Sequence, residues 1–318
     1  MPRFSVIIPC YNRATLIGRT LLSVFDQTFQ DFEIVVVDDG STDNSIQVVE
    51  QYKSVRLFRQ ANAGPGAARN RALAEACGEY VAILDSDDIW FPWTLEYYET
   101  ALRKFDNPAW VSGNEFTFHD EAAIRGITRA QPVFDHSPDL IQYSQKHPAA
   151  WLPPSAVTIR TETFRQVGGY APEKIWAEDL DLWLKLGTAK GFVRIDTPYM
   201  VAMRQHPNNI SKMTPPWVRG LNYILDCEAR GGYPGGPARR RGRHAMITFP
   251  IRNCSLRCLD EGLARDGIDL YWRTFGWHIM EGRLKFLTGF PLIAAWKSLT
   301  RRGAHSAARK ELSGGARL

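Results

Sequence analysis

The sequence has little cysteine and no long apolar run. Its 318 residues include five cysteines, and none of them are spaced as Cys-x-x-Cys. An odd number without that spacing predicts neither a disulfide framework nor a zinc site, and it indicates a reducing compartment. No window approaches 18 uninterrupted apolar residues, and no signal peptide precedes the apolar run at Phe4. We therefore expect a cytoplasmic protein, either free or held peripherally at the inner face of the plasma membrane.

Charge is modest and unevenly distributed. Apolar residues make up 44% of the chain and charged residues 23%, which is the composition of a globular protein that forms a core. The net charge is +5, and residues 301–318 carry five Lys or Arg against one acid, a local net charge of +4. Four more arginines lie between residues 239 and 243. Such patches suit an anionic partner, either nucleic acid or a membrane surface, or they form an ordinary solvated face.

The first hundred residues alternate between apolar runs and helical periodicity. The expected strands are residues 4–8, 33–37, 55–58 and 80–84. Their β-branched side chains without polar alternation are typical of strands buried on both faces. Helical spacing of apolar residues lies between each pair of runs. This order predicts an α/β fold with a doubly wound, mostly parallel sheet and flanking helices.

The pattern loosens after residue 105. We expect a helix at 92–105 and another at 175–187, and strands at 110–118, 155–160 and 192–195. A connection as long as 119–151 is uncommon unless it is functional, so we expect it to border a substrate site or to contain short elements. From Thr214 onward prolines, glycines and helical periodicity dominate. The predicted organisation is a catalytic domain at 1–214 and a smaller helical C-terminal region at 215–318.

Three acids follow the fourth apolar run, at Asp85, Asp87 and Asp88. In an open α/β sheet, ligands bind outside the carboxyl ends of the strands, so these acids face the ligand crevice. They repel one another unless a cation lies among them, and a hard divalent ion shared with a substrate phosphate would satisfy them. The alternative is that Asp87 or Asp88 caps the helix that begins near Pro92.

Six segments occur in the order seen in glycosyltransferase family 2, and the chain resembles that family over about residues 4–212. The segments are Ser5–Asn12, Val36–Asp43, Gly64–Asn70, Asp85–Asp88, Glu178–Asp179 and Arg204–His206. The resemblance implies a GT-A fold and an inverting transfer of sugar from a nucleotide-sugar. It also implies Mn²⁺ or Mg²⁺ as cofactor.

The resemblance places a nucleotide pocket at the ends of the first two strands. The backbone at Pro9 and Tyr11 and the carboxylate of Asp39 are expected to hold the base. A carboxylate only accepts hydrogen bonds, which suits the ring N–H of uracil and favours a UDP-hexose or UDP-N-acetylhexosamine. Arg69 is expected near the base and ribose, and a surface salt bridge is its alternative role.

The resemblance also supplies the metal ligands. Asp87 is the better candidate, and Asp85 lies nearer the ribose or binds through water; Asp88 has no assigned role. His206 matches a family position near the diphosphate and the metal, although a histidine before a proline is by default a surface loop residue. A divalent ion would stabilise the charge that develops on the departing nucleoside diphosphate.

Glu178 and Asp179 are the candidates for the general base. Their alternative role is to complement the positive end of the helix that they begin. An inverting displacement needs one carboxylate to take the proton of the acceptor hydroxyl, and we assign it to Asp179, with Glu178 as the alternative. Asp181 should point elsewhere. Trp176 is a candidate for stacking on sugar.

Three rival interpretations remain to be weighed. Gly64-Pro-Gly66 resembles a dinucleotide fingerprint but lacks the third glycine and follows the third strand instead of the first. A sugar-nucleotide-binding or scaffolding protein of the same fold, without catalysis, is the main alternative. Nucleic-acid binding is suggested only by the arginines, and we expect none. The expected acceptor is a glycan or a lipid-linked acceptor.

The segment from Arg283 to Leu299 mixes bulky apolar side chains with basic ones. Such a segment suits a membrane interface and suits docking on the catalytic domain equally well, so both hypotheses stay open. Cys254 and Cys258 lie one turn apart on an expected helix, and we predict that they are buried and bind no metal.

Overall fold

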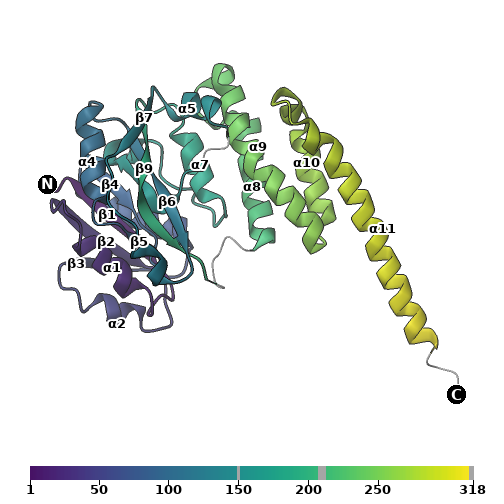
Figure 1. Cartoon of the computed structure of the whole chain (residues 1–318), viewed down its shortest axis with the longest axis horizontal. Coiled ribbons are helices and arrows are strands. Elements are labelled where there is room, and N and C mark those ends of the chain that lie inside the picture. The colour runs from purple at the N-terminus through teal and green to yellow at the C-terminus, as the bar shows by residue number, and fades with distance from the viewer. Residues whose placement is uncertain (149–150, 207–212, 315–318) are drawn as a thin grey trace.

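The computed structural model describes residues 1–148, 151–206 and 213–314, with side chains up to Thr300. Figure 1 shows an α/β part built around one sheet, followed by a helical part. The strands are β1 (Phe4–Cys10), β2 (Phe32–Asp38), β3 (Val55–Arg59), β4 (Tyr80–Ile83), β5 (Ile89–Trp90), β6 (Trp110–Phe118), β7 (Val133–Ser137), β8 (Val157–Arg160) and β9 (Phe192–Arg204).

The helices of the α/β part are α1 (Ile17–Phe25), α2 (Ser45–Val49), α3 (Pro65–Glu75), α4 (Thr94–Lys104), α5 (Leu140–Lys146), α6 (Thr161–Gln166) and α7 (Glu178–Lys185). Short 3₁₀ turns lie at Glu121–Ile124 and Pro154–Ala156. The helical part consists of α8 (Thr214–Ala229), α9 (Gly236–Glu261), α10 (Ala264–Met280) and α11 (Leu284–Gly314).

The predicted doubly wound sheet is confirmed. Its order is β3-β2-β1-β4-β8-β6-β9-β5, with β7 paired to β9. Strands β3, β2, β1 and β4 are parallel, whereas β8 joins β4 and β6 in antiparallel pairs, so the second half of the sheet is mixed. Parallel strands end at one edge, which therefore collects the residues that follow β1, β2 and β4.

Both faces of the sheet are covered, as the uniformly apolar strands require. In β1, Val6 and Ile8 pack in the cluster that includes α1 and α4, whereas Ile7 packs in the cluster that includes α3. All three are fully buried. Each such side chain stabilises the fold by about 1.5–3 kcal/mol relative to an exposed one, so the edge that carries the site is rigidly supported.

Two expectations from the second half of the sequence need correction, and one is met. The helix expected at 92–105 is the shorter α4, and β5 precedes it. The connection at 119–151 contains a 3₁₀ turn, β7 and α5, as one of the two expectations allowed. The strand expected to end at Ile195 continues to Arg204, because β9 pairs with β6 across irregularities near Asn114. Pairing with neighbours overrode the polar interruption at 196–198.

The helical part packs on the α/β part and shares a core with it. Ala177 and Leu184 of the α/β part lie in one cluster with residues of α8, α9 and α10. Cys254 and Cys258 are buried in that cluster, as predicted. Helix α8 begins at Thr214, and the division into a catalytic domain and a C-terminal region at that residue stays a proposal.

Candidate functional site

One cavity of about 700 Å³ lies at the carboxyl edge of β1, β2 and β4. Nearly all the predicted site residues line it: Pro9, Tyr11, Asp39, Arg69, Asp85, Asp87, Glu178 and Asp179. His206 reaches the site indirectly, since its Nε2 lies 3.0 Å from Oδ2 of Asp87. Residues from all six segments of the sequence therefore line one cavity, the sixth through Arg204.

The carboxylate of Asp39 is buried and held at the start of α3. It accepts hydrogen bonds from Gln60 Nε2 at 2.8 Å and from the backbone N–H groups of Ala63 at 2.9 Å and Gly64 at 2.8 Å. Gly64 has φ of 95°, a conformation that glycine adopts readily, and this conformation accompanies the approach of its N–H to Asp39. A carboxylate offers about four acceptor positions, so one remains for a ligand N–H.

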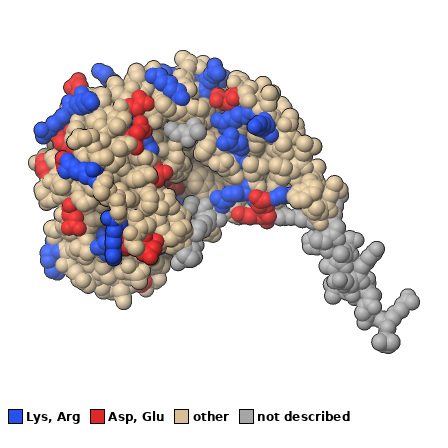
Figure 2. Space-filling model, viewed as in Figure 1, with Lys and Arg blue, Asp and Glu red and all other residues tan. Residues whose placement is uncertain are grey.

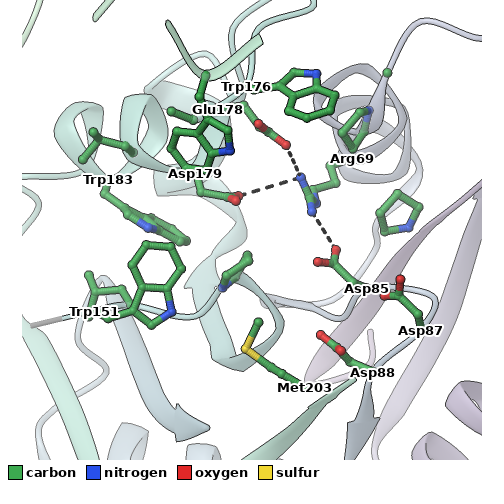
Figure 3. Close-up of a pocket in the computed structure, with 18 of the residues that line it drawn as sticks. Arg69, Asp85, Asp87, Asp88, Trp151, Trp176, Glu178, Asp179, Trp183 and Met203 are labelled. Atoms are coloured by element: carbon green, nitrogen blue, oxygen red, sulfur yellow. Dashed lines mark hydrogen bonds and ion pairs between the residues drawn. The ribbon is translucent and has the colours of Figure 1, made fainter. Parts of the chain in front are cut away.

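Arg69 bridges the two sides of the cavity. Its guanidinium lies 2.6 Å from Asp85 Oδ1, 3.2 Å from Glu178 Oε1 and 3.7 Å from Asp179 Oδ1 (Figure 3). It also lies over the ring of Tyr170, 5.1 Å from the centroid. The side chain is only 4% exposed, so the surface salt bridge considered as an alternative is excluded. The expected place of Arg69 beside base and ribose stays a proposal.

Glu178 and Asp179 begin α7 at the cavity wall. Burial raises the pKa of Glu178 to about 7, and the neighbouring charge of Asp179 adds to this effect. Burial also raises the pKa of Asp179, while Arg69 and the Tyr170 hydroxyl, which donates to Asp179 at 3.1 Å, oppose the shift. The helix terminus favours the charged forms of both carboxyls. Burial outweighs that effect, so both carboxyls hold their protons to higher pH than exposed ones do.

Asp181 confirms the expectation that it points elsewhere. It is fully buried and accepts a hydrogen bond from the hydroxyl of Tyr233 at 2.8 Å. Lys185, one turn along α7, lies 2.7 Å from its other oxygen. These contacts hold α7 against the segment between α8 and α9, so Asp181 serves the fold and not the cavity.

Asp87 and Asp88 are adjacent but have different surroundings. Oδ2 of Asp87 accepts a hydrogen bond from Arg13 Nε at 3.0 Å and faces His206. The buried Asp88 accepts from Ser155 Oγ at 2.6 Å and from the backbone N–H of Arg204 at 2.9 Å. Burial raises the pKa of Asp88 well above its usual value. Both acids line the cavity, but Asp88 also joins the segments of Ser155 and Arg204.

The capping alternative for these acids is wrong. Helix α4 begins at Thr94 after Trp93, and no side chain makes a capping hydrogen bond at its N-terminus. Asp87 and Asp88 bond to other segments instead. The acids are therefore not explained by the start of a helix.

The acids fit a divalent cation that is completed by substrate. Within the described ranges, no group of three or more His, Cys, Asp or Glu is arranged to hold a metal by itself. Magnesium sites in nucleotide enzymes commonly use one or two carboxylates together with substrate phosphates. Asp85 and Asp87 supply carboxylate oxygens at the cavity wall, and His206 supplies an imidazole beside Asp87. This donor set suits Mg²⁺ or Mn²⁺.

The sequence did not single out several residues of the cavity. Arg13, Trp151 and Trp217 line it, as do Met246 and Phe249 of α9. Arg13 directly follows the Ser5–Asn12 segment, so its position could have marked it as a candidate site residue. The others lie in the long connection and in the helical part, where no motif marks them, and only the packing of α8 and α9 brings them to the cavity.

Helix α8 presses on the backbone that precedes Glu178. A Cβ atom at Gly220 would lie 1.4 Å from the carbonyl oxygen of Trp176, so only glycine fits. Ala177, the next residue, has φ of 72°, a left-handed conformation that costs energy for a residue with a side chain. Helix α8 therefore contacts the chain at the strained turn that leads into α7.

We expect Gly220→Ala to damage both stability and activity. The new methyl group must displace Trp176, which lowers the free energy of unfolding by about 1–3 kcal/mol or more. The shift reaches Glu178 and Asp179, so turnover should fall by about tenfold to a hundredfold. Thermal unfolding and transfer assays measure the two effects.

Gly276→Ala in α10 is the matched control, because a Cβ there meets nothing within 4 Å. Alanine favours a helix over glycine by up to about 1 kcal/mol, so this variant should be at least as stable as the parent and equally active. Equal effects of the two substitutions would show that α8 does not position the turn.

Comparisons with known proteins show that the chain has the fold of GT-A glycosyltransferases. The profile described as Glycosyl transferase family 2 matches residues 5–147. The chain is 31% identical over 196 residues to TuaG of Bacillus subtilis, a putative teichuronic acid biosynthesis glycosyltransferase, covering 60% of this chain and 74% of TuaG. The chain belongs to glycosyltransferase family 2.

Other relatives are matched over less of their length. An uncharacterised glycosyltransferase of Nostoc sp. is 36% identical over 191 residues, which cover 55% of this chain and 57% of that protein. The next two curated relatives are covered over 29% and 35% of their length. The chain thus spans from about a third to somewhat over half of these three relatives.

Solved structures share the fold. Residues 1–349 of S. aureus TarS in complex with UDP-GlcNAc align with a TM-score of 0.59 and 21% identity, covering 88% of this chain and 92% of that one. The mannosyltransferase PcManGT of Pyrobaculum calidifontis, in complex with GDP-Man and Mn²⁺, aligns with a TM-score of 0.53 and 19% identity, covering 94% and 87%. At these identities the likeness establishes the fold alone.

Proposed function

We propose that the protein is an inverting, metal-dependent glycosyltransferase. It moves a hexose or N-acetylhexosamine from a UDP-sugar to a hydroxyl of a glycan or lipid-linked acceptor in cell-surface polysaccharide synthesis. One observation carries the proposal. A single cavity is lined by the acids expected to bind the nucleotide and its metal, and the two acids of α7 lie on the other side of Arg69. The complexes of TarS with UDP-GlcNAc and of PcManGT with GDP-Man and Mn²⁺ support a nucleotide-sugar donor.

The nucleotide-sugar donor and its metal ion bind at Asp39, Asp85 and Asp87. The remaining acceptor position of Asp39 suits the ring N–H of uracil, which would cost about 1–3 kcal/mol if it were buried unpaired. Asp85, Asp87 and His206 would hold Mn²⁺ or Mg²⁺, which supplies Lewis-acid stabilisation of the departing diphosphate. Arg13 adds a cation beside Asp87 at the side of the expected phosphate region.

The acceptor side uses the carboxylate of Asp179. As the acceptor hydroxyl attacks C1 of the sugar, the C1–O bond to the diphosphate breaks and the hydroxyl proton passes to Asp179. The Tyr170 hydroxyl and Arg69 orient this carboxylate. Figure 3 shows Asp179 on the side of the cavity where Trp151 and Trp183 lie, whereas Glu178 lies closer to Trp176. This placement favours Asp179 over Glu178 as the base.

The rest of the cavity suits the acceptor. Trp151, Trp176, Trp217, Met246 and Phe249 line it on the side of the helical part. Flat aromatic faces suit the C–H face of a sugar ring or an apolar chain. Acceptor choice therefore depends on α8 and α9, which lie outside the region matched by the family profile.

The proposal is tested by calorimetric titration of UDP, GDP and ADP into the purified protein, each with Mn²⁺ and with EDTA. Tight binding of UDP that requires Mn²⁺ supports the roles of Asp39 and Asp87 together. A preference for GDP overturns the uracil assignment and keeps the family. Binding of UDP without any transfer to glycan or lipid-linked acceptors would favour a sugar-nucleotide-binding or scaffolding protein.

Asp87→Ala should weaken the binding of UDP in the presence of Mn²⁺ by at least about tenfold, because it removes the better placed carboxylate ligand. Binding measured in EDTA should change little. Glu50→Ala is a control, since that side chain is 52% exposed, pairs with Arg59 and is not one of the residues that line the cavity. Equal UDP affinity of Asp87→Ala and the parent with Mn²⁺ would remove Asp87 from the metal site.

The rate of transfer should fall in acid. The pKa of Glu178 is raised to about 7 and that of its neighbour Asp179 is also raised, so the basic form of each is lost at a higher pH than in an exposed carboxyl. A plot of kcat/KM against pH should therefore have an acid limb above the usual range of an aspartate. Glu178→Gln removes a neighbouring negative charge and should move that limb to lower pH. An unchanged limb would place the titrating group elsewhere.

A further inference from the structure

The exposed apolar side chains are concentrated at one end of the molecule. Of the sixteen large apolar residues that are exposed in the part of the chain described with side chains, nine lie between residues 268 and 299. They are Ile268, Trp272, Ile279, Met280, Leu284, Leu292, Ile293, Trp296 and Leu299. Single exposed apolar residues are normal on a soluble surface, but such a concentration marks an interaction surface.

Helix α11 has two apolar faces. Phe286, Phe290 and Ala294, spaced four residues apart, are buried in a cluster with residues of α9 and α10. On another side of the helix, Leu292 is 72%, Trp296 62% and Leu299 69% exposed. Docking on the rest of the chain, one of the two sequence-based hypotheses, explains the first face only. The second face has no partner within the described chain.

Helix α10 extends this surface. Ile268, Trp272 and Ile279 recur at helical spacing on one side of α10 and are 38%, 62% and 53% exposed. Figure 1 shows α10 and α11 at the end of the molecule farthest from the sheet, with α11 projecting away from the body. We call the exposed residues of α10 and of α11 up to Leu299 the apolar end face.

The side chains of the apolar end face indicate which kind of partner it contacts. Tryptophan is enriched at the boundary between lipid and water, and lysines beside an apolar stripe can extend their ammonium groups to headgroups. The exposed Lys285 lies on α11 among the apolar residues, Lys297 pairs with Asp260 of α9, and residues 301–318 follow with a net charge of +4. Each basic residue near an anionic surface adds about 1 kcal/mol of attraction. Two copies paired through this face would bring like charges together.

We propose that the apolar end face lies in the interfacial layer of a membrane that contains anionic phospholipid. In the described part of the chain, no helix combines the length and apolar character needed to cross a bilayer. The contact lies parallel to the surface, with the apolar side chains at the boundary of the acyl chains and Lys285 at the headgroups. This inference goes beyond the transfer reaction and does not depend on it.

The test is sedimentation of the full chain with vesicles of phosphatidylcholine, with and without phosphatidylglycerol. The protein should bind the anionic vesicles tightly, bind neutral ones more weakly, and lose affinity as salt rises. Its tryptophan fluorescence should shift to the blue on binding. The triple variant Leu292→Gln, Trp296→Gln, Leu299→Gln should lose at least about a hundredfold in affinity, because three exposed apolar groups no longer enter the lipid.

The matched control is Leu22→Gln with Val133→Gln, two exposed apolar residues of the α/β part, which should leave vesicle binding unchanged. Unchanged UDP titration in both variants shows that they are folded and separates this proposal from the proposed function. Anionic-vesicle binding that the triple variant retains would overturn the proposal. So would a parent protein that ignores vesicles and is dimeric, with the triple variant monomeric, because a second copy would then cover the face.

Discussion

Asp179→Asn lowers kcat by about 10²- to 10⁴-fold, which is the range that a positioned general base contributes. The amide keeps the size of the carboxylate, and its oxygen still accepts the hydrogen bond from Tyr170. The change therefore removes proton acceptance while preserving the packing of α7. The affinity for UDP in Mn²⁺ should change by less than about twofold, because Asp179 lies across Arg69 from the donor-side acids. Single-turnover transfer and nucleotide titration measure the two quantities.

Glu178→Gln is the control that decides between the two acids. The Glu178 carboxyl lies beside Arg69 and is expected to influence only the charge state of Asp179. Its loss should therefore lower kcat by less than about tenfold. If Glu178→Gln loses more activity than Asp179→Asn, the base is Glu178. If Asp179→Asn turns over at the parent's rate, neither the assignment nor the proposed chemistry of α7 stands.

Arg69→Met lowers the free energy of unfolding by about 3–5 kcal/mol, the cost of removing one partner from a buried ion pair. Arg69 is the shared partner of Asp85, Glu178 and Asp179, and its side chain is 4% exposed. Methionine fills much of the same space, so the loss comes from the uncompensated acids. Urea unfolding measures the change in midpoint at constant slope.

Arg71→Met is the matched control on the same helix. Arg71 is 52% exposed and pairs with Glu75 one turn along α3, and such surface pairs contribute at most about 1 kcal/mol. The loss caused by Arg69→Met should also be larger at pH 8 than at pH 5, because protonation of the raised-pKa carboxyls relieves their repulsion in acid. Equal losses for the two arginines, or no dependence on pH, would mean that Arg69 does not hold the three acids.

The chemistry of the site could be predicted from the sequence because it resides in short segments. Asp39 and Asp85 follow apolar runs that form strands in any tertiary context, and parallel strands bring their carboxyl ends to one edge. The fold class followed for the same reason, since periodicity and β-branched runs are local properties. The sequence alone thus determined that a doubly wound sheet would present acids at one edge.

Tertiary structure decided how those acids are connected and what surrounds them. The position of Arg69 between Asp85 and Glu178 depends on α3 and α7 meeting across the cavity, and no periodicity encodes that contact. Trp217 and Phe249 reach the cavity only because α8 and α9 pack on α7, with Gly220 against Trp176. Such contacts join residues far apart in the chain, and their energy depends on packing and burial. Local sequence patterns therefore predicted the acids that line the cavity, whereas burial and packing between distant segments determine the pKa values of those acids and the aromatic wall of the cavity.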